Sequence, residues 1–88
     1  MRKYRVGRIF TIEELKRISR NLRFLRYINE NTREEVSQAT GLSVGTITKL
    51  ELEQYKSTYP NVVKMAAFFE VSPEDVINKK LFVSYEFI

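Results

Sequence analysis

The 88-residue chain contains no cysteine, no histidine and no tryptophan, and it has only three glycines and two prolines. Without cysteine it can form no disulfide, thiolate metal site or cysteine nucleophile. Without histidine it also lacks the commonest general base and the usual zinc ligand. These absences exclude the common enzyme and metalloprotein classes. We therefore expect a binding protein that is not an enzyme and that uses no cofactor and no metal.

Long apolar runs are also missing, because consecutive apolar residues come only a few at a time. No segment is therefore expected to cross a membrane, and no secretory signal pattern opens the chain. With no cysteine to oxidise, a reducing cytoplasmic compartment is the expected location. The length suits one domain with one hydrophobic core, over residues 1–88.

The charged residues are unevenly distributed along the chain. Fifteen Lys and Arg stand against eleven Asp and Glu, for a net charge of +4. Residues 1–33 hold ten basic and three acidic residues, a net charge of +7, whereas residues 34–88 have a net charge of −3. This asymmetry indicates either a polyanionic partner for the basic part or a solvated helix face. Composition alone favours neither.

Apolar spacing predicts a first helix over residues 12–28. Thr11 and Glu14 have the spacing of a capping box, so the helix should begin near residue 12. Apolar residues then recur at three- and four-residue steps and form one stripe that should face the core. The members of this stripe are Ile12, Leu15, Ile18, Leu22, Leu25 and Ile28. A break near residues 19–20, with two short helices in place of one, is the alternative.

The segment 32–53 has the pattern of a helix, a tight turn and a second helix. Thr32 and Glu35 repeat the capping box. Gly41 stands where the first of these helices should end, in the left-handed conformation that glycine adopts at little cost. A small residue there should also let the two helices approach closely. Ser43 is placed to cap the second helix.

Two more helices are expected, and each has a start signal. Thr58 can cap a strongly apolar helix that carries Pro60 in its first turn. Ser72 can cap a short helix that opens with Pro73 and two acidic residues. The helical core should therefore cover residues 12–78.

The flanking segments, residues 1–10 and 79–88, alternate loosely between apolar and polar residues. This pattern favours two short strands, which could pair with each other or across a dimer. The competing interpretation for residues 1–10 is a flexible basic arm that lies along a groove of DNA.

The order of these patterns over residues 21–77 resembles the lambda-repressor-like, Cro/CI-type helix-turn-helix domains of the XRE family. The matching positions are Leu22, Leu25, Arg26 and Ile28, then 32–37 with Gly41, then 43–47 with Leu50 and Glu51, and finally Val62, Met65, Ala66, Phe69 and 71–77. The resemblance implies an all-α, five-helix DNA-binding domain. It also implies a bacterial or phage-type transcriptional regulator of repressor kind, which binds operator sites in double-stranded DNA as a homodimer. The expected location is the cytoplasm of a bacterial cell or phage-infected host.

The resemblance further implies that helix 43–53 enters the major groove of DNA. Base edges would be read by Val44, Gly45, Thr46 and Lys49, with Thr48 on the flank. Val44 would touch a thymine methyl group and Lys49 would donate to guanine acceptors. Phosphate contacts would come from Thr32, Arg33, Ser43, Tyr55, Lys56, Ser57 and Thr58. The alternative is that these are ordinary exposed helix residues and a polar loop that caps the next helix.

Arg26 and Glu51 have a different expected role. In the family, a basic residue of the first helix and an acid that closes the third form a largely buried ion pair, and these two residues occupy the matching positions. The resemblance therefore assigns Arg26 to the structure of the domain and not to DNA contact.

The chain also departs from the family pattern. Leu52 and Glu53 follow Glu51 where a basic or small residue and a glycine are usual, and Gly45 brings no side chain to a reading position. Glu70 stands where a glycine is expected at the end of the fourth helix. Either specificity comes partly from DNA shape, or the surface has changed toward another partner. The alternative function, a protein–protein adaptor of antirepressor or antitoxin-like kind, is favoured by four residues on the exposed edge of helix 43–53: Val44, Gly45, Leu52 and Glu53. A regulatory protein partner is possible under either interpretation.

Overall fold

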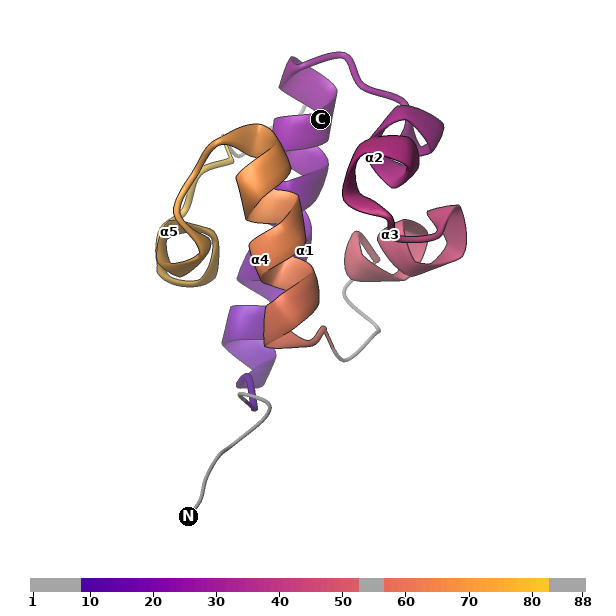
Figure 1. Cartoon of the computed structure of the whole chain (residues 1–88). Helices are drawn as coiled ribbons and strands as arrows, with labels where there is room; N and C mark the ends of the chain where they lie inside the picture. The colour runs from indigo at the N-terminus through magenta and orange to yellow at the C-terminus, as the bar shows by residue number, and fades with distance from the viewer. Residues whose placement is uncertain (1–8, 53–56, 83–88) are drawn as a thin grey trace.

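The computed structural model describes residues 9–52 and 57–82 and folds them into helices joined by short loops (Figure 1). The helices are α1 (Ile12–Ile28), α2 (Arg33–Thr40), α3 (Val44–Leu50), α4 (Tyr59–Phe69) and α5 (Pro73–Asn78). The described residues contain no strand, so the predicted all-α, five-helix fold is confirmed. Within them, no helix has the length and apolar character needed to cross a membrane. Most of the two strand-like segments, residues 1–8 and 83–88, lies outside the described residues.

All the helices start where the capping residues predict. Each begins directly after a Thr or Ser whose hydroxyl accepts a hydrogen bond from a backbone N–H of the first turn: Thr11, Thr32, Ser43, Thr58 and Ser72. The capping boxes of Thr11 with Glu14 and Thr32 with Glu35 are both complete. Helix α1 continues without interruption through residues 19–20, so the alternative of two short helices is wrong.

Gly41 ends α2 in the left-handed conformation, at φ 82°. A Cβ atom added at this position would meet no atom within 4 Å. The expectation that a small residue at position 41 lets α2 and α3 approach closely is therefore wrong, because the glycine is required by the backbone conformation alone. Two glutamates, Glu30 at φ 58° and Glu70 at φ 60°, occupy the same region at greater cost.

The hydrophobic core draws residues from all five helices. Its buried members are Phe10, Ile18, Leu22, Val36, Leu42, Ile47, Leu50, Val62, Met65, Ala66, Val76 and Ile77. The ends of the predicted α1 stripe are not among them, since Ile12 is 69% exposed and Ile28 is 54% exposed. The side chains of Ile12 and Ile28 therefore lie at the surface and do not contribute to the core.

A buried asparagine in α1 holds the segment that follows α5. Asn21 Nδ2 donates to the backbone carbonyl oxygens of Val76 (2.8 Å) and Lys79 (2.7 Å). Its Oδ1 accepts from the backbone N–H groups of Leu81 (2.8 Å) and Phe82 (3.2 Å). The side chain is inaccessible to solvent and all its hydrogen-bonding capacity is used. These bonds fix the position of residues 79–82 against α1.

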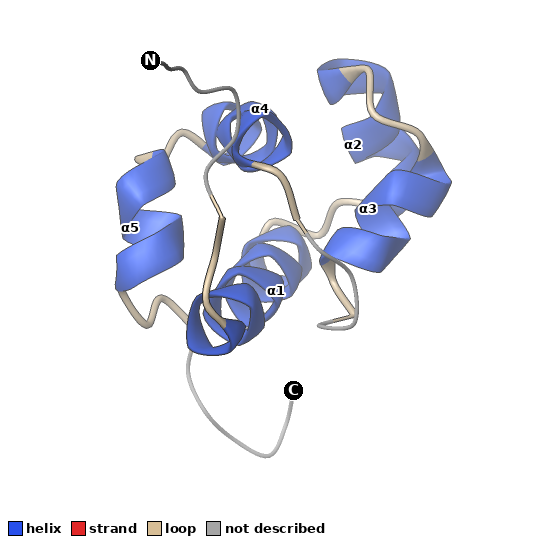
Figure 2. Ribbon diagram, turned by 90° about the horizontal axis from the view of Figure 1, so that it is seen from below, coloured by secondary structure: helices blue, strands red, loops and turns tan. Residues whose placement is uncertain are grey.

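Helices α1 and α4 form the centre of the molecule. In both views α5 lies on one side of this pair, and α2 and α3 lie on the other (Figures 1 and 2). Helix α5 packs on α1 and α4. Helices α2 and α3 pack on each other, and α2 also packs on α4 and α3 on α1. The helix-turn-helix unit is thus separated from the segment that follows α5 by the body of α1.

Candidate nucleic-acid interface

Helix α3 has one buried side and one open side. Ile47 and Leu50 are inaccessible to solvent and anchor the helix in the core. On the open side Gly45 and Lys49 are exposed, and the other predicted base-reading residues, Val44, Thr46 and Thr48, are half-buried. The helix therefore displays the five predicted base-reading positions without loss of its hydrophobic anchor. It ends at Leu50, three residues before the predicted boundary.

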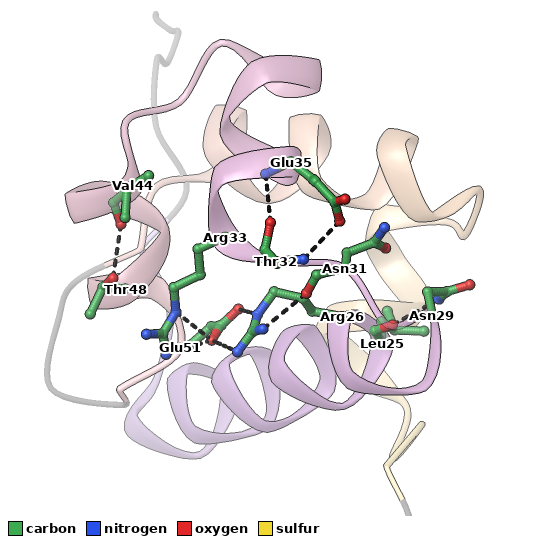
Figure 3. Close-up of polar contacts among 10 residues, drawn as sticks. All are labelled: Leu25, Arg26, Asn29, Asn31, Thr32, Arg33, Glu35, Val44, Thr48 and Glu51. Atoms are coloured by element: carbon green, nitrogen blue, oxygen red, sulfur yellow. Dashed lines mark hydrogen bonds and ion pairs between the residues drawn. The ribbon is translucent and has the colours of Figure 1, made fainter.

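The first turn of α3 is held by side-chain hydrogen bonds. Ser43 Oγ accepts from the backbone N–H of Thr46 and donates to Thr46 Oγ1, both at 3.0 Å. Thr48 Oγ1 donates to the backbone carbonyl oxygen of Val44 at 2.9 Å (Figure 3). The Thr48 hydroxyl is therefore already used within the helix.

The carboxylate of Glu51, directly after α3, is completely buried and receives hydrogen bonds from two arginines (Figure 3). Arg26 donates from Nε to Oε2 at 2.7 Å and from Nη2 to Oε1 at 3.0 Å. Arg33 donates from Nε and Nη2 to Oε1, at 3.2 and 3.0 Å. Arg26 Nη1 also donates to the carbonyl oxygen of Asn31 at 3.1 Å. One cluster therefore connects α1, the start of α2 and the end of α3.

The electrostatics of this cluster favour its charged form. The hydrogen bond from the Arg26 side chain to Glu51 raises the pKa of Arg26, and the charges of Glu51 and Glu34 act in the same direction, against the effect of burial. Two guanidinium groups and one carboxylate leave a net charge of +1 at the end of α3. Glu51 therefore does not present an uncompensated negative charge to an approaching anion.

Arg33 is the member of the cluster that sequence reasoning missed. Its position at the start of α2 indicated a phosphate contact, and no local pattern indicates that the side chain turns toward Glu51. The side chain is 34% exposed, against 18% for Arg26. One signal could have suggested the pair. In a helix-turn-helix the start of α2 lies near the end of α3, and these are the positions of Arg33 and Glu51.

Four of the remaining predicted phosphate contacts lie among the described residues. Thr32 and Ser43 are exposed, and each caps its helix. Thr58 is exposed and accepts from the backbone N–H of Asn61 at 3.4 Å. Ser57 is buried, with 6% exposure, and its hydroxyl has no hydrogen-bond partner among the described residues. In this conformation the Ser57 side chain does not face solvent, whereas a phosphate contact through its hydroxyl requires exposure.

Two of the predicted contacts, Tyr55 and Lys56, lie outside the described residues, as does Glu53. The exposure of Leu52, at 43%, places an apolar side chain at the surface just after α3.

The comparisons with known proteins agree with this geometry. A family model of the helix-turn-helix type matches residues 29–76, which is more than half of the chain. A crystal structure described as a hypothetical transcription factor, NHTF, from Neisseria superposes with a TM-score of 0.68. The two chains are 18% identical, and the alignment covers 86% of this chain and 88% of the other. No curated protein matches this chain.

The chain belongs to the helix-turn-helix family of XRE, or lambda-repressor-like, type. The likeness to the Neisseria structure shows that the common fold extends beyond the matched residues. Members of this family bind DNA and regulate transcription, and this chain is a DNA-binding transcriptional regulator of that class.

Proposed function

We propose that the chain recognises a specific operator sequence in double-stranded DNA, with α3 in the major groove. The observation that carries the proposal is the two-sided burial of α3. Its inner residues, Ile47 and Leu50, fix the helix in the core, and its opposite face carries Gly45 and Lys49 in the open. The major groove of B-DNA is wide enough for one such helix.

Three side chains are the proposed base-reading groups. Lys49 donates hydrogen bonds to guanine O6 or N7, Thr46 bonds to a base edge, and Val44 contacts a thymine methyl group. Gly45 and Thr48 are proposed as neighbours of the bases. Gly45 has no side chain, so the backbone of α3 can approach the groove closely there. A Cβ added at Gly45 would meet only Ser43 Oγ, at 3.9 Å, so the fold itself does not require glycine at this position.

Phosphate contacts are proposed for groups around α3. Arg33 uses Nε and Nη2 on Glu51, and within the described residues its Nη1 makes no hydrogen bond. That N–H group and the backbone at the start of α2 can bind a phosphate oxygen, with Thr32 beside them. Ser43, at the start of α3, is a separate proposed contact. Thr58 is a further proposed contact, and Ser57 contributes through its backbone. Tyr55 and Lys56, which lie outside the described residues, are proposed from the sequence alone. These contacts position the domain and carry no sequence information.

The regulator is proposed to bind as a homodimer. One helix-turn-helix unit reads only a few base pairs, and two units on half-sites one helical turn apart give the specificity that an operator needs. Occupancy of such a site would repress transcription by blocking a promoter.

Binding to genomic DNA fragments over a series of salt concentrations tests the proposed function. We expect a few fragments to be retained preferentially, with an affinity that falls steeply as salt rises, because phosphate contacts release counterions. Analytical ultracentrifugation of the complex should show two chains on each preferred fragment. Retention of all fragments to the same extent would contradict sequence-specific binding.

A second candidate function is a protein–protein adaptor on the same fold. It is favoured by the exposed Leu52 after α3 and by the lack of a side chain at Gly45. If no DNA fragment is preferred and a stable protein partner depends on Leu52, the adaptor replaces the operator-binding regulator.

A further inference from the structure

A second basic surface lies away from α3. A shallow pocket of about 210 Å³ is formed by Glu13, Lys16, Arg17 and Arg20 on α1 with Lys80 and Phe82 after α5. Four of its six residues are cationic and one is acidic. The pocket therefore has an excess of three positive charges in a small volume.

The pocket has an apolar wall as well as cations. The Arg20 guanidinium carbon lies 5.9 Å from the centre of the Phe82 ring, and Lys80 Nζ lies 5.3 Å from the same centre. Two cations thus converge on one aromatic ring. Their mutual repulsion is reduced when an anion binds between them, and the ring offers apolar surface to the rest of the ligand.

The pocket is part of the folded body. Arg17 Nη1 donates to the carbonyl oxygen of Ile77 at 2.9 Å, which ties the base of the pocket to the end of α5. Phe82 is held by the hydrogen bond from its backbone N–H to Asn21 Oδ1. The cationic side chains that face solvent, Lys16, Arg20 and Lys80, are therefore arranged on a fixed support.

We propose that this pocket is a docking site for an acidic peptide segment of a partner protein, with carboxylates on Lys16, Arg20 and Lys80 and an apolar side chain on Phe82. The charges of the pocket complement such a segment. The volume is smaller than that of typical ligand cavities and suits one or two side chains. In a DNA duplex the bases are stacked inside and are not available to the ring, whereas a peptide can place an apolar side chain on it.

The position of the pocket separates this role from DNA binding. The pocket residue Arg17 bonds to Ile77 of α5, and α5 lies on the opposite side of α1 from α2 and α3 (Figure 2). A duplex bound along α3 does not cover it, so the regulator can hold DNA and an acidic partner at the same time. The proposal does not depend on the proposed operator binding, because the pocket and its test involve neither α3 nor DNA.

The test uses the full chain and a short fluorescein-labelled peptide of Asp and Glu with interspersed Phe. Fluorescence anisotropy is compared for wild type, Lys16→Glu and Lys64→Glu. The control Lys64 is also an exposed helical lysine and lies outside the pocket, so both variants change the net charge equally. We expect Lys16→Glu to weaken peptide binding by roughly five- to tenfold and Lys64→Glu by less than about twofold.

A second variant and a second probe isolate the aromatic wall. Phe82→Ser should lower the affinity for the Phe-containing peptide and leave unchanged the affinity for a peptide with Ser in place of Phe. Thermal unfolding shows whether each variant is folded, and any unfolded variant is replaced by Lys80→Glu, which changes an exposed side chain.

Three results would overturn the proposal. The first is no binding of the acidic peptide to wild type. The second is an equal loss with Lys16→Glu and Lys64→Glu, which would mean that only net charge matters. In the third, Lys16→Glu weakens binding to a random-sequence DNA duplex and Lys64→Glu does not, while the affinity for the peptide is unchanged in both. That result would assign the pocket to nucleic acid.

Discussion

Arg33 and Glu51 are joined by two hydrogen bonds to the same carboxylate oxygen, from Nε at 3.2 Å and from Nη2 at 3.0 Å. Arg33 is the first residue of α2, and Glu51 directly follows α3. This contact closes the helix-turn-helix unit at the end opposite the Gly41 turn. It joins the start of α2 to the end of α3, beside the bond between Arg26 and the same carboxylate.

The buried carboxylate should be essential for stability. Glu51→Gln removes the negative charge that two guanidinium groups share, and it leaves them close together with one acceptor oxygen. We expect the free energy of unfolding to fall by about 3–5 kcal/mol, measured by urea denaturation. Glu30→Gln, which removes the same charge at an exposed residue, should change it by less than about 0.5 kcal/mol. Equal effects would show that Glu51 is not the centre of the cluster.

The two arginines should differ in their importance for stability. Arg26 makes three hydrogen bonds and is 18% exposed, whereas Arg33 makes two and is 34% exposed. We expect Arg26→Ala to cost about 3 kcal/mol and Arg33→Ala about 1 kcal/mol in the same assay. The raised pKa of Arg26 keeps this contribution constant up to strongly alkaline pH, where it is lost as the guanidinium deprotonates. A larger loss for Arg33→Ala would contradict the assignment.

Asn21 should control the order of the segment after α5. Asn21→Ala removes four hydrogen bonds to the backbone of residues 76–82 and leaves buried polar groups without partners. We expect a loss of about 2–4 kcal/mol and faster hydrogen exchange of the Leu81 amide. Asn78→Ala, at an exposed residue of α5, is the matched control and should change stability little. Unchanged protection of Leu81 in Asn21→Ala would show that other contacts hold the segment.

Replacing Glu70 by glycine should stabilise the folded protein. It caps α4 at φ 60° and ψ 41°, where a residue with a side chain is strained and glycine is not. Glu70→Gly should raise the free energy of unfolding by about 1 kcal/mol, which corresponds to about 4–8 °C in the melting temperature. Glu74→Gly, placed at a helical position of α5, should lower it. A lower melting temperature for Glu70→Gly would mean that its side chain makes compensating contacts.

The helices could be predicted from the sequence because their starts are encoded locally. Thr11 with Glu14 and Thr32 with Glu35 satisfy orphan N–H groups within one turn, and Gly41 permits a backbone angle that other residues resist. The apolar period also placed Ile18 and Leu22 in the core correctly. Such signals depend on neighbours along the chain, so no knowledge of the tertiary structure is needed.

The misplaced residues depend on contacts between distant segments. Ile12 and Ile28 have the right period, but the period does not reveal where the partner helices end. Asn21 falls near the apolar stripe and is buried because residues 55 to 61 positions away bring their backbone to it. Arg33 turns toward Glu51 for the same reason. Tertiary geometry, and not local propensity, decides such positions.

The most direct test of the central claim is selection from a random-sequence DNA duplex library by wild type, Lys49→Ala and Arg33→Ala. If α3 reads the major groove, wild type enriches one sequence, and Lys49→Ala loses the preference for guanine at one position of it. Arg33→Ala should enrich the same sequence as wild type, with weaker binding to all duplexes. If wild type enriches no sequence, or if Lys49→Ala enriches the wild-type sequence unchanged, α3 is not the reading helix.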